Sequence, residues 1–451
     1  MEKYNCLKNI FFLFVLLANS ANLSAQYNPV SLAPQVPKPP NPYSAFSPYS
    51  NIVKMEQQTN RNIAPQNQPN RNNYLEQYER DRMETERRNA ELLRIMNENR
   101  DISYDLPSLS NIEGTEYYRQ AAEKLTNMLR GKTQLNLRDA VFAVENAYFE
   151  GILDKTRYNK SIDDLIYLAK QQAANDKYNW NNNLTKNIML FKIMADTLKI
   201  KLPLQEKTIT SYPMQYDFDD PHGRIDFSKQ FVYKLLSTRS GQCHSLPLLY
   251  LIMCETVGAE AYLAYSPLHS YVKIKDKTGN WYNIELTNGR FTTDAFVTGS
   301  GFVTAEAIKN RIYLEPQTKK QTIANCFVDL LGGYTRKYGY DEFVNRCVDT
   351  ILKYDTKNLR ALMSRSNYQT FRLGYIMSQI GQPSLETLKQ RYPKVYELLE
   401  ECKKIYEKID ELGYREMPEE AYKEWLETMN REKKRIEEHE AKYGKILQLL
   451  N

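Results

Sequence analysis

The sequence predicts an α+β protein, in which a helix with a cysteine at its N-terminus packs on a small antiparallel sheet between mainly α-helical segments. Three observations predict this class. An apolar helical stretch runs from Cys243 to Val257. Three short strand patterns follow it directly, with turn residues between them. Apolar residues at helical spacing dominate both before this block, from Glu116 to Lys201, and after it, beyond Gln317.

The composition fits a soluble globular protein and excludes some classes of function. The chain has 451 residues, of which 42% are hydrophobic and 26% charged, so it can bury a core in two or three domains. Its net charge of +6 is small, and basic residues alternate with acidic ones, which argues against nucleic-acid binding. No CxxC pair is present, and the sequence predicts neither a metal site nor an organic cofactor.

Residues 1–25 have the pattern of a cleaved secretory signal peptide. Lys3 and Lys8 precede an apolar run from Ile10 to Leu17, which is about half as long as the roughly 20 residues of a membrane-spanning helix. No comparable run follows, so we expect no transmembrane span after cleavage and a secreted, periplasmic or cell-envelope protein. Cleavage removes one of six cysteines, and the odd number left predicts at least one unpaired thiol.

Changes in composition divide the rest of the chain into four regions. The predicted regions are a disordered Pro/Asn/Gln-rich tether with a charged helix (26–100), a helical subdomain (101–205), the α+β core (206–316) and a helical C-terminal region (317–451). In the helical subdomain, Val141, Val144 and Tyr148 recur at helical spacing and predict a buried face. The charge runs of the last two predicted helices, near the end of the chain, predict solvated faces.

Individual elements follow from local patterns, taken in chain order. Helices are predicted over Leu184–Leu198, Phe227–Ser237, Cys243–Val257, Tyr392–Leu412 and Glu419–Glu440, and strands over Ala259–Tyr265, Ser270–Lys275 and Trp281–Leu286. The turn Lys277-Thr278-Gly279-Asn280 joins the last two strands as an antiparallel pair.

The core contains a cysteine, a histidine and an acid in the order expected of a thiol nucleophile site. Cys243 opens a helix, where free backbone N–H groups favour a thiolate, and its own N–H can hold an oxyanion. His269 and Glu285 lie on two successive strands, as expected for a base and the acid that orients it.

Only one of the four histidines suits the role of base. His244 follows Cys243 directly, and its ring points about 100° away on a helix. His222 lies in an acidic Pro-Gly turn and His439 in a charged helix, where both are expected to be surface residues. His269 begins a strand after the turn Ser266-Pro267-Leu268, which leaves it as the candidate base.

Three motifs in this order resemble the transglutaminase-like superfamily. They are Ser240-Gly241-Gln242-Cys243-His244-Ser245, Pro267-Leu268-His269-Ser270-Tyr271 and Trp281-Tyr282-Asn283-Ile284-Glu285. The likeness is strongest to the SirB1-like branch, and the segment Leu331–Ala361 resembles one tetratricopeptide unit of the kind that follows such cores. The resemblance covers about residues 135–316 and implies a papain/transglutaminase-like core.

The resemblance also implies roles for the site residues. The family's nucleophile corresponds to Cys243, its base to His269 and its orienting acid to Glu285, where the family pattern usually has Asp. Asn288, three residues later, is an alternative orienting residue.

Two functions follow as expectations. The first is an exported thiol enzyme that hydrolyses an amide or peptide bond in a protein or peptide substrate, with acyl transfer to an amine as the less favoured outcome. The second is a catalytically inactive protein-binding module of the cell envelope, because some members of the superfamily resemble binding modules that have lost the catalytic set. The sequence selects no substrate and no oligomeric state.

Overall fold

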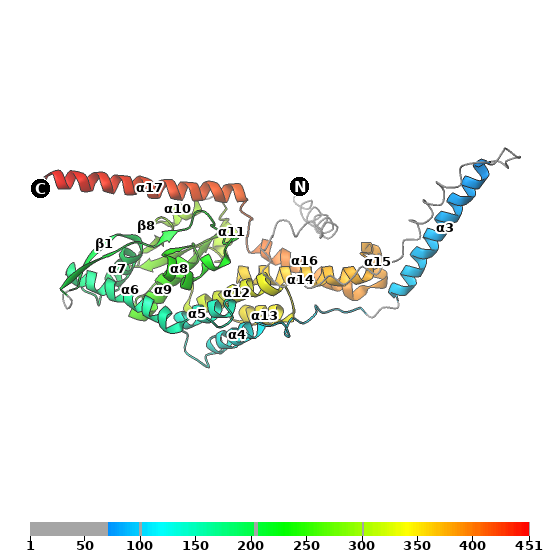
Figure 1. Cartoon of the computed structure of the whole chain (residues 1–451), viewed down its shortest axis with the longest axis horizontal. Coiled ribbons are helices and arrows are strands. Elements are labelled where there is room, and N and C mark those ends of the chain that lie inside the picture. Colours follow the sequence, from blue (N-terminus) through cyan, green and yellow to red (C-terminus); the bar gives the residue numbers. More distant parts are fainter. Residues whose placement is uncertain (1–70, 99–101, 203–205, 300–301, 451) are drawn as a thin grey trace, which may run out of the picture. The chain divides into compact units, whose positions relative to one another are not determined.

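The computed structural model describes residues 71–98, 102–202, 206–299 and 302–450 (Figure 1). The predicted signal peptide and most of the predicted tether lie outside these residues. Backbone contacts divide the chain into two compact units, Met1–Ser103 with Ile376–Ser384, and Tyr104–Tyr375 with Leu385–Asn451. In the first unit, α3 (Arg71–Glu98) is a charged helix whose described side chains, from Glu76 to Leu92, are all exposed.

The second unit contains most of the described helices. Before the candidate nucleophile they are α4 (Thr115–Leu129), α5 (Leu137–Tyr148), α6 (Lys155–Asn175), α7 (Asn183–Ala195), the 3₁₀ helix η3 (Phe227–Gln230) and α8 (Val232–Thr238). After it they are α9 (Ser245–Val257), α10 (Asp294–Thr298), α11 (Ala305–Lys309), α12 (Lys319–Tyr338), α13 (Glu342–Tyr354), α14 (Leu359–Ile380), α15 (Leu385–Arg391), α16 (Pro393–Glu411) and α17 (Glu419–Leu450).

Three small sheets are described alongside these helices. An antiparallel hairpin joins β1 (Leu198–Leu202) to β2 (Lys207–Ser211), and β3 (Gln215–Tyr216) pairs in parallel with β4 (Ser240–Gly241). The largest sheet is antiparallel, with the order β5 (Tyr262–Ser266), β6 (His269–Lys275), β7 (Trp281–Glu285) and β8 (Arg290–Thr292). The mixture of helices with small antiparallel sheets confirms the α+β class.

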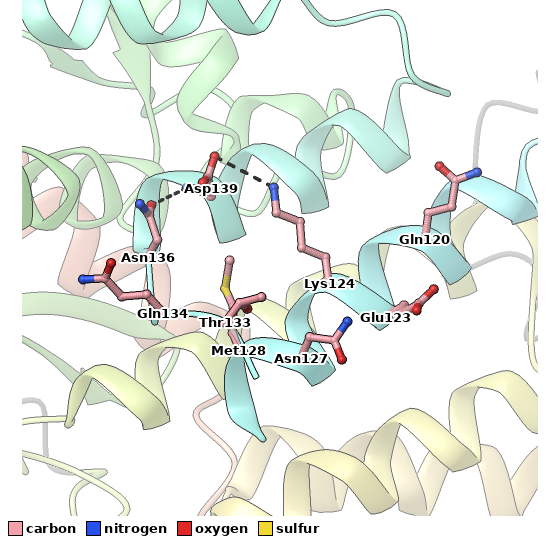
Figure 2. Close-up of a pocket in the computed structure, with 9 residues that line it drawn as sticks. All are labelled: Gln120, Glu123, Lys124, Asn127, Met128, Thr133, Gln134, Asn136 and Asp139. Atoms are coloured by element: carbon pink, nitrogen blue, oxygen red, sulfur yellow. Dashed lines mark hydrogen bonds and ion pairs between the residues drawn. The ribbon is translucent and has the colours of Figure 1, made fainter. Parts of the chain in front are cut away.

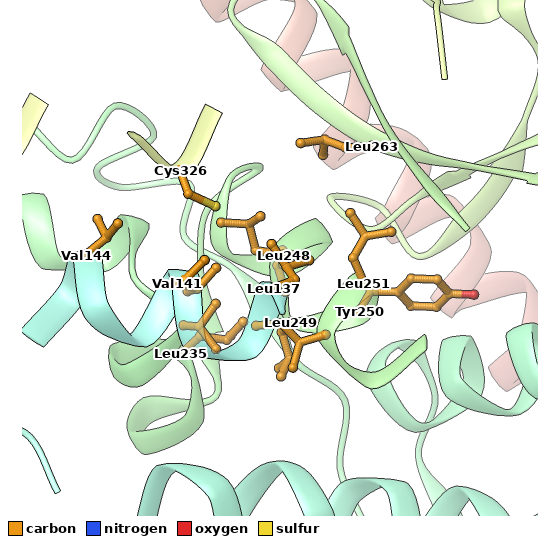
Figure 3. Close-up of a cluster of buried hydrophobic side chains, with 14 of the residues drawn as sticks. Leu137, Val141, Val144, Leu235, Leu248, Leu249, Tyr250, Leu251, Leu263 and Cys326 are labelled. Atoms are coloured by element: carbon orange, nitrogen blue, oxygen red, sulfur yellow. The ribbon is translucent and has the colours of Figure 1, made fainter. Parts of the chain in front are cut away.

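Helix α9 lies at the centre of the second unit. Every residue from Ser245 to Cys254 is buried, so this helix is covered on all sides, as expected for a helix that is apolar around its whole circumference. It packs against α5, α7, α8 and the strands β5 and β6. Figure 3 shows part of this packing, with Val141 of α5, Leu235 of α8, Leu249 of α9 and Leu263 of β5 in one cluster.

A single hydrophobic cluster links the three folded regions expected from the sequence. It extends from Tyr118 in α4 through α9 and the β5–β8 sheet to Leu426 in α17. Helix α12 packs on both α4 and α5 as well as on α13. The α+β core is therefore held between helices that precede it and helices that follow it. No helix in the described part of the chain is apolar over a length sufficient to cross a membrane.

Three differences between the observed and the predicted elements concern helices near the candidate site. The predicted helix Leu184–Leu198 ends at Ala195, because the following residues alternate between buried and exposed as β1. The predicted helix Phe227–Ser237 is broken at Phe231, which has an extended backbone between η3 and α8. Helix α9 begins at Ser245, so Cys243 lies just before the helix.

A buried carboxyl group fixes the helix that leads into the candidate site. Glu145 of α5 is 2% exposed and accepts hydrogen bonds from the backbone N–H groups of Val232 (2.6 Å) and Tyr233 (2.9 Å), at the start of α8. Burial raises the pKa of Glu145 to about 8, although these two hydrogen bonds act in the opposite direction. Phe231, the N-cap residue of α8, offers no side-chain acceptor, so Glu145 replaces the cap.

We expect Glu145→Ala to lower the free energy of unfolding by about 2 kcal/mol, because two N–H groups at a buried helix start lose their acceptor. Urea unfolding monitored by circular dichroism measures this loss. Glu150→Ala, which removes a half-exposed carboxylate paired with Lys337, is the matched control and should change stability by less than about 0.5 kcal/mol. Equal losses in the two variants would contradict the capping role.

Candidate active site

Cys243 lies between the short strand β4 and helix α9. A Cβ atom at Gly241 would lie 2.5 Å from the Ser245 Oγ and 3.1 Å from a methyl carbon of Leu235, so the packing of these two side chains favours glycine here. Ser245 Oγ accepts a hydrogen bond from the Gln242 N–H at 2.9 Å, which ties the loop to the first turn of α9. The Cys243 side chain is partly exposed.

His269 is the first residue of β6 and follows a two-residue turn. Ser266 pairs with His269 across this turn, and Pro267 and Leu268 form its tip. Leu268 has a φ of 55°, a left-handed conformation that costs a leucine roughly 1–2 kcal/mol. A positive φ is what a two-residue turn with proline at its first position requires at the second, and Leu268 lies directly before the candidate base.

The structure brings His269 and Glu285 into direct contact. His269 Nε2 lies 2.6 Å from Glu285 Oε2, and both side chains are 2% exposed. The second carboxylate oxygen, Oε1, accepts the N–H of Thr287 at 2.9 Å, which fixes the orientation of the carboxylate. The longer Glu side chain therefore reaches the imidazole, in the place where the family pattern usually has Asp.

The electrostatic environment favours a positively charged His269. Burial alone lowers the pKa of His269, but the adjacent Glu285 carboxylate and the Cys243 side chain outweigh it and raise the pKa to about 10.

The nitrogen of His269 that does not contact Glu285 is available to the thiol. Nδ1 is buried and has no hydrogen-bond partner among the described residues, while the Cys243 side chain lies close enough to influence the charge of the ring. The Cys243 sulfur lies 3.9 Å from the Leu268 carbonyl oxygen. Ser270 Oγ donates to the Cys243 carbonyl oxygen at 2.5 Å, which joins the cysteine loop to β6.

No protein-family model, curated protein or solved structure matches this chain.

Asn288, the alternative orienting residue, lies elsewhere. Its Nδ2 donates to the Met429 Sδ at 3.6 Å, and its Oδ1 is buried without a hydrogen-bond partner in the described part of the protein. Glu285, and not Asn288, holds the His269 ring.

Two of the other histidines have partners of their own. His244 Nε2 lies 3.1 Å from Asp329 Oδ2, so its ring is directed to α12 and away from the thiol, as the sequence predicts. His222 packs on the ring of Tyr422 with 4.5 Å between ring centroids and is half-buried, in contrast to the surface position expected for it. The side chain of His439 lies outside the described residues.

Helix α17 contributes to the site, which the sequence patterns do not predict. The Trp425 ring meets His269 edge to face at 4.6 Å between centroids, and Tyr422 is 1% exposed. The charge runs of this helix predict a solvated face, yet Tyr422, Leu426 and Met429 are all buried. Their spacing of four and three residues is the helical signal that identifies this apolar stripe.

Two cavities are described away from the thiol. Figure 2 shows the larger one, about 520 Å³, between α4 and the start of α5, where Asp139 faces Lys124 at 3.8 Å. The other, about 220 Å³, borders His244 and Asp329. Neither cavity is lined by Cys243 or His269. No group of three metal-binding side chains occurs among the residues that the structure describes.

Proposed function

We propose that this protein is an exported thiol enzyme with a papain/transglutaminase-like core, which hydrolyses an amide or peptide bond through Cys243, His269 and Glu285. The observation that supports it most is the buried contact of 2.6 Å between His269 Nε2 and Glu285, which leaves Nδ1 for the neighbouring thiol. A nucleophile, a base and an orienting acid arranged in this way are the requirements for covalent catalysis by a cysteine.

The arrangement supports a two-step reaction. The Cys243 thiolate attacks the carbonyl carbon, a C–S bond forms, and the C–N bond breaks as His269 gives its Nδ1 proton to the departing amine. Neutral His269 then takes a proton from water while the oxygen of that water attacks the thioester. The C–S bond breaks, the acid product leaves, and the thiolate and imidazolium are restored. Glu285 keeps its charge throughout and stabilises the imidazolium.

The export and envelope location belong to the same proposal and depend on the N-terminal sequence pattern. The substrate class that fits the chemistry is a protein or peptide. The transglutaminase-like motifs and the helix pair α12 and α13, which contains most of the tetratricopeptide-like segment, support the SirB1-like branch as the family.

One observation favours the alternative of a non-catalytic binding module. His269 is 5% exposed and its Nδ1 is buried. A substrate amine can therefore reach this nitrogen only if neighbouring side chains move. Reactivity of the thiol distinguishes the two functions, because only the enzyme requires an activated Cys243.

We expect iodoacetamide at pH 6 to alkylate Cys243 at least about 10-fold faster than glutathione, because the neighbouring imidazolium stabilises the thiolate. Mass spectrometry of peptides after timed quenching gives the rate at each cysteine. Cys254 is the internal control: it is 2% exposed, and burial raises the pKa of its thiol, so it should remain unmodified in the folded protein. A Cys243 rate at or below that of glutathione would favour the binding module.

A further inference from the structure

Helix α17 covers the candidate active site. Besides the contact of Trp425 with His269, α17 is joined to the sheet by Glu432, which pairs with Arg290 of β8 at 3.0 Å. Lys433 donates to the Gln215 side chain of β3 at 2.7 Å. Figure 1 shows this helix running alongside β8. These contacts join the first half of α17 to β3, β6 and β8.

Two tyrosine hydroxyls meet at this point. Tyr422 comes from α17 and is 1% exposed, while Tyr216 comes from β3, pairs in register with Gly241 and is 5% exposed. Both rings lie close enough to Cys243 for their hydroxyls to interact electrostatically with its sulfur. Burial raises the pKa of both phenols, so both hydroxyls keep their protons at any pH at which a thiol enzyme works.

The two hydroxyls lie within reach of each other, and the Tyr422 hydroxyl also lies within reach of the Cys243 sulfur. Neither hydroxyl makes a hydrogen bond of normal geometry to a described residue. A buried donor without a partner destabilises the folded state, so its presence needs an explanation, and service to a ligand or a reaction is one of them. The His269 Nδ1 atom is unpartnered in the same place. Three buried polar atoms that make no hydrogen bond of normal geometry thus lie near one sulfur, and they are candidate donors to a group that accepts hydrogen bonds.

We propose that the Tyr422 hydroxyl, assisted by the Tyr216 hydroxyl, donates a hydrogen bond to the oxyanion that forms when Cys243 attacks a carbonyl group. This inference rests on the proposed function. As the C–S bond forms, the electron pair of the carbonyl double bond moves to oxygen, and the phenol stabilises that charge without giving up its proton. The pair returns when the C–N bond breaks. Helix α17 thereby supplies a catalytic residue.

The rates of acylation and alkylation of Cys243, compared in one variant, distinguish a role of Tyr422 at the oxyanion from a purely structural role. Acylation by p-nitrophenyl acetate passes through an oxyanion, whereas alkylation by iodoacetamide does not. We expect Tyr422→Phe to slow acylation of Cys243 about 100-fold. We expect the alkylation rate, measured at its high-pH plateau, to stay within about 3-fold of that of the unmodified protein.

Two further variants complete the experiment. Tyr216→Phe should give the same pattern with a smaller loss, and it keeps the test decisive if Tyr422→Phe does not fold. Tyr158→Phe is the matched control, because this phenol is also buried without a hydrogen-bond partner but packs against Phe142, far along the chain from the thiol. Its acylation rate should not change.

Each other outcome overturns the inference. Unchanged acylation in both tyrosine variants shows that the hydroxyls serve no oxyanion. If the acylation and alkylation rates of the tyrosine variants fall equally, the phenol acts on the thiolate. If both rates rise equally, α17 instead blocks access to the thiol. An unmodified protein that is never acylated at Cys243 overturns the proposed function as well, so the two failures are distinguishable.

Discussion

Replacing His269 with glutamine should slow acylation of Cys243 by p-nitrophenyl acetate about 1,000-fold at pH 7. His269 Nδ1 is the only ring nitrogen that the described structure leaves for the thiol, since Nε2 is held by Glu285 at 2.6 Å. Without the imidazole, the thiolate loses the cation that stabilises it, and general acid–base catalysis of this kind contributes about 10²–10⁴-fold. Stopped-flow detection of p-nitrophenolate measures the rate.

The matched control is His244→Gln. His244 is adjacent to Cys243 in sequence, yet it pairs with Asp329 at 3.1 Å, so its loss should change the acylation rate by no more than about 3-fold. Thermal unfolding of both variants shows whether each is folded. If His244→Gln lost the activity while His269→Gln kept it, the assignment of the base would be wrong.

Replacing Glu285 with glutamine should reduce acylation and turnover by about 10³–10⁴-fold, because an amide cannot stabilise the imidazolium and favours the wrong tautomer of His269. Glu285→Asp keeps the charge but shortens the side chain by one methylene. The 2.6 Å contact with Nε2 would then lengthen, so we expect a smaller loss of about 10–100-fold. An Asp variant as active as the original would contradict the requirement for the reach of glutamate.

The same pair has a signature in stability that does not depend on substrate. The pKa of His269 is about 10 in the folded protein, above its ordinary value of 6.5, so protonation favours the folded state. This contribution is fully present below about pH 6.5 and is lost as the pH rises towards 10. In Glu285→Gln the carboxylate that contributes most to the raised pKa is absent, although the Cys243 side chain remains, so this pH dependence should become much weaker.

Urea unfolding of the two proteins at pH 6, 8 and 10 tests this expectation. The difference in the free energy of unfolding between the original protein and Glu285→Gln should be largest at pH 6 and narrow by a few kcal/mol by pH 10. Titrations elsewhere in the chain are common to both proteins and cancel in the difference. A difference that is constant over this range would show that His269 is neutral in the folded state.

Three residues of the candidate site were predictable because each lies in a short sequence pattern that identifies it. Cys243 precedes an apolar helix, and His269 and Glu285 lie on adjacent strands. The local patterns of these elements therefore predict that the three residues lie close together. The choice between Glu285 and Asn288 was not predictable, because it depends on side-chain reach across the β6–β7 register. Tyr422 and Trp425 were missed because their helix is dominated by charged residues, and its partner surface lies far away in the sequence.

In the fold, too, elements with a clear local pattern were predictable, and those that depend on tertiary contacts were not. The strands β6 and β7 follow clear alternating patterns and a turn sequence, and both lie within two residues of their predicted bounds. The hairpin of β1 and β2 was missed, although Leu198, Ile200 and Leu202 alternate with exposed lysines, because the preceding helical pattern extends into it. The break at Phe231 arises from Glu145, whose capping of α8 is a tertiary contact that no local pattern contains.

The position of Tyr422 and Trp425 has a consequence for how the protein matures. A polypeptide emerges from the ribosome, or passes through an export channel, with its N-terminal part first. Cys243, His269 and Glu285 are therefore available to fold well before the residues of α17 appear. A nascent or interrupted chain would carry a thiol, a base and an acid but lack the helix that packs on them. If Tyr422 serves the oxyanion, the site reaches its full rate only after the residues of α17 have been synthesised and have packed on β3, β6 and β8.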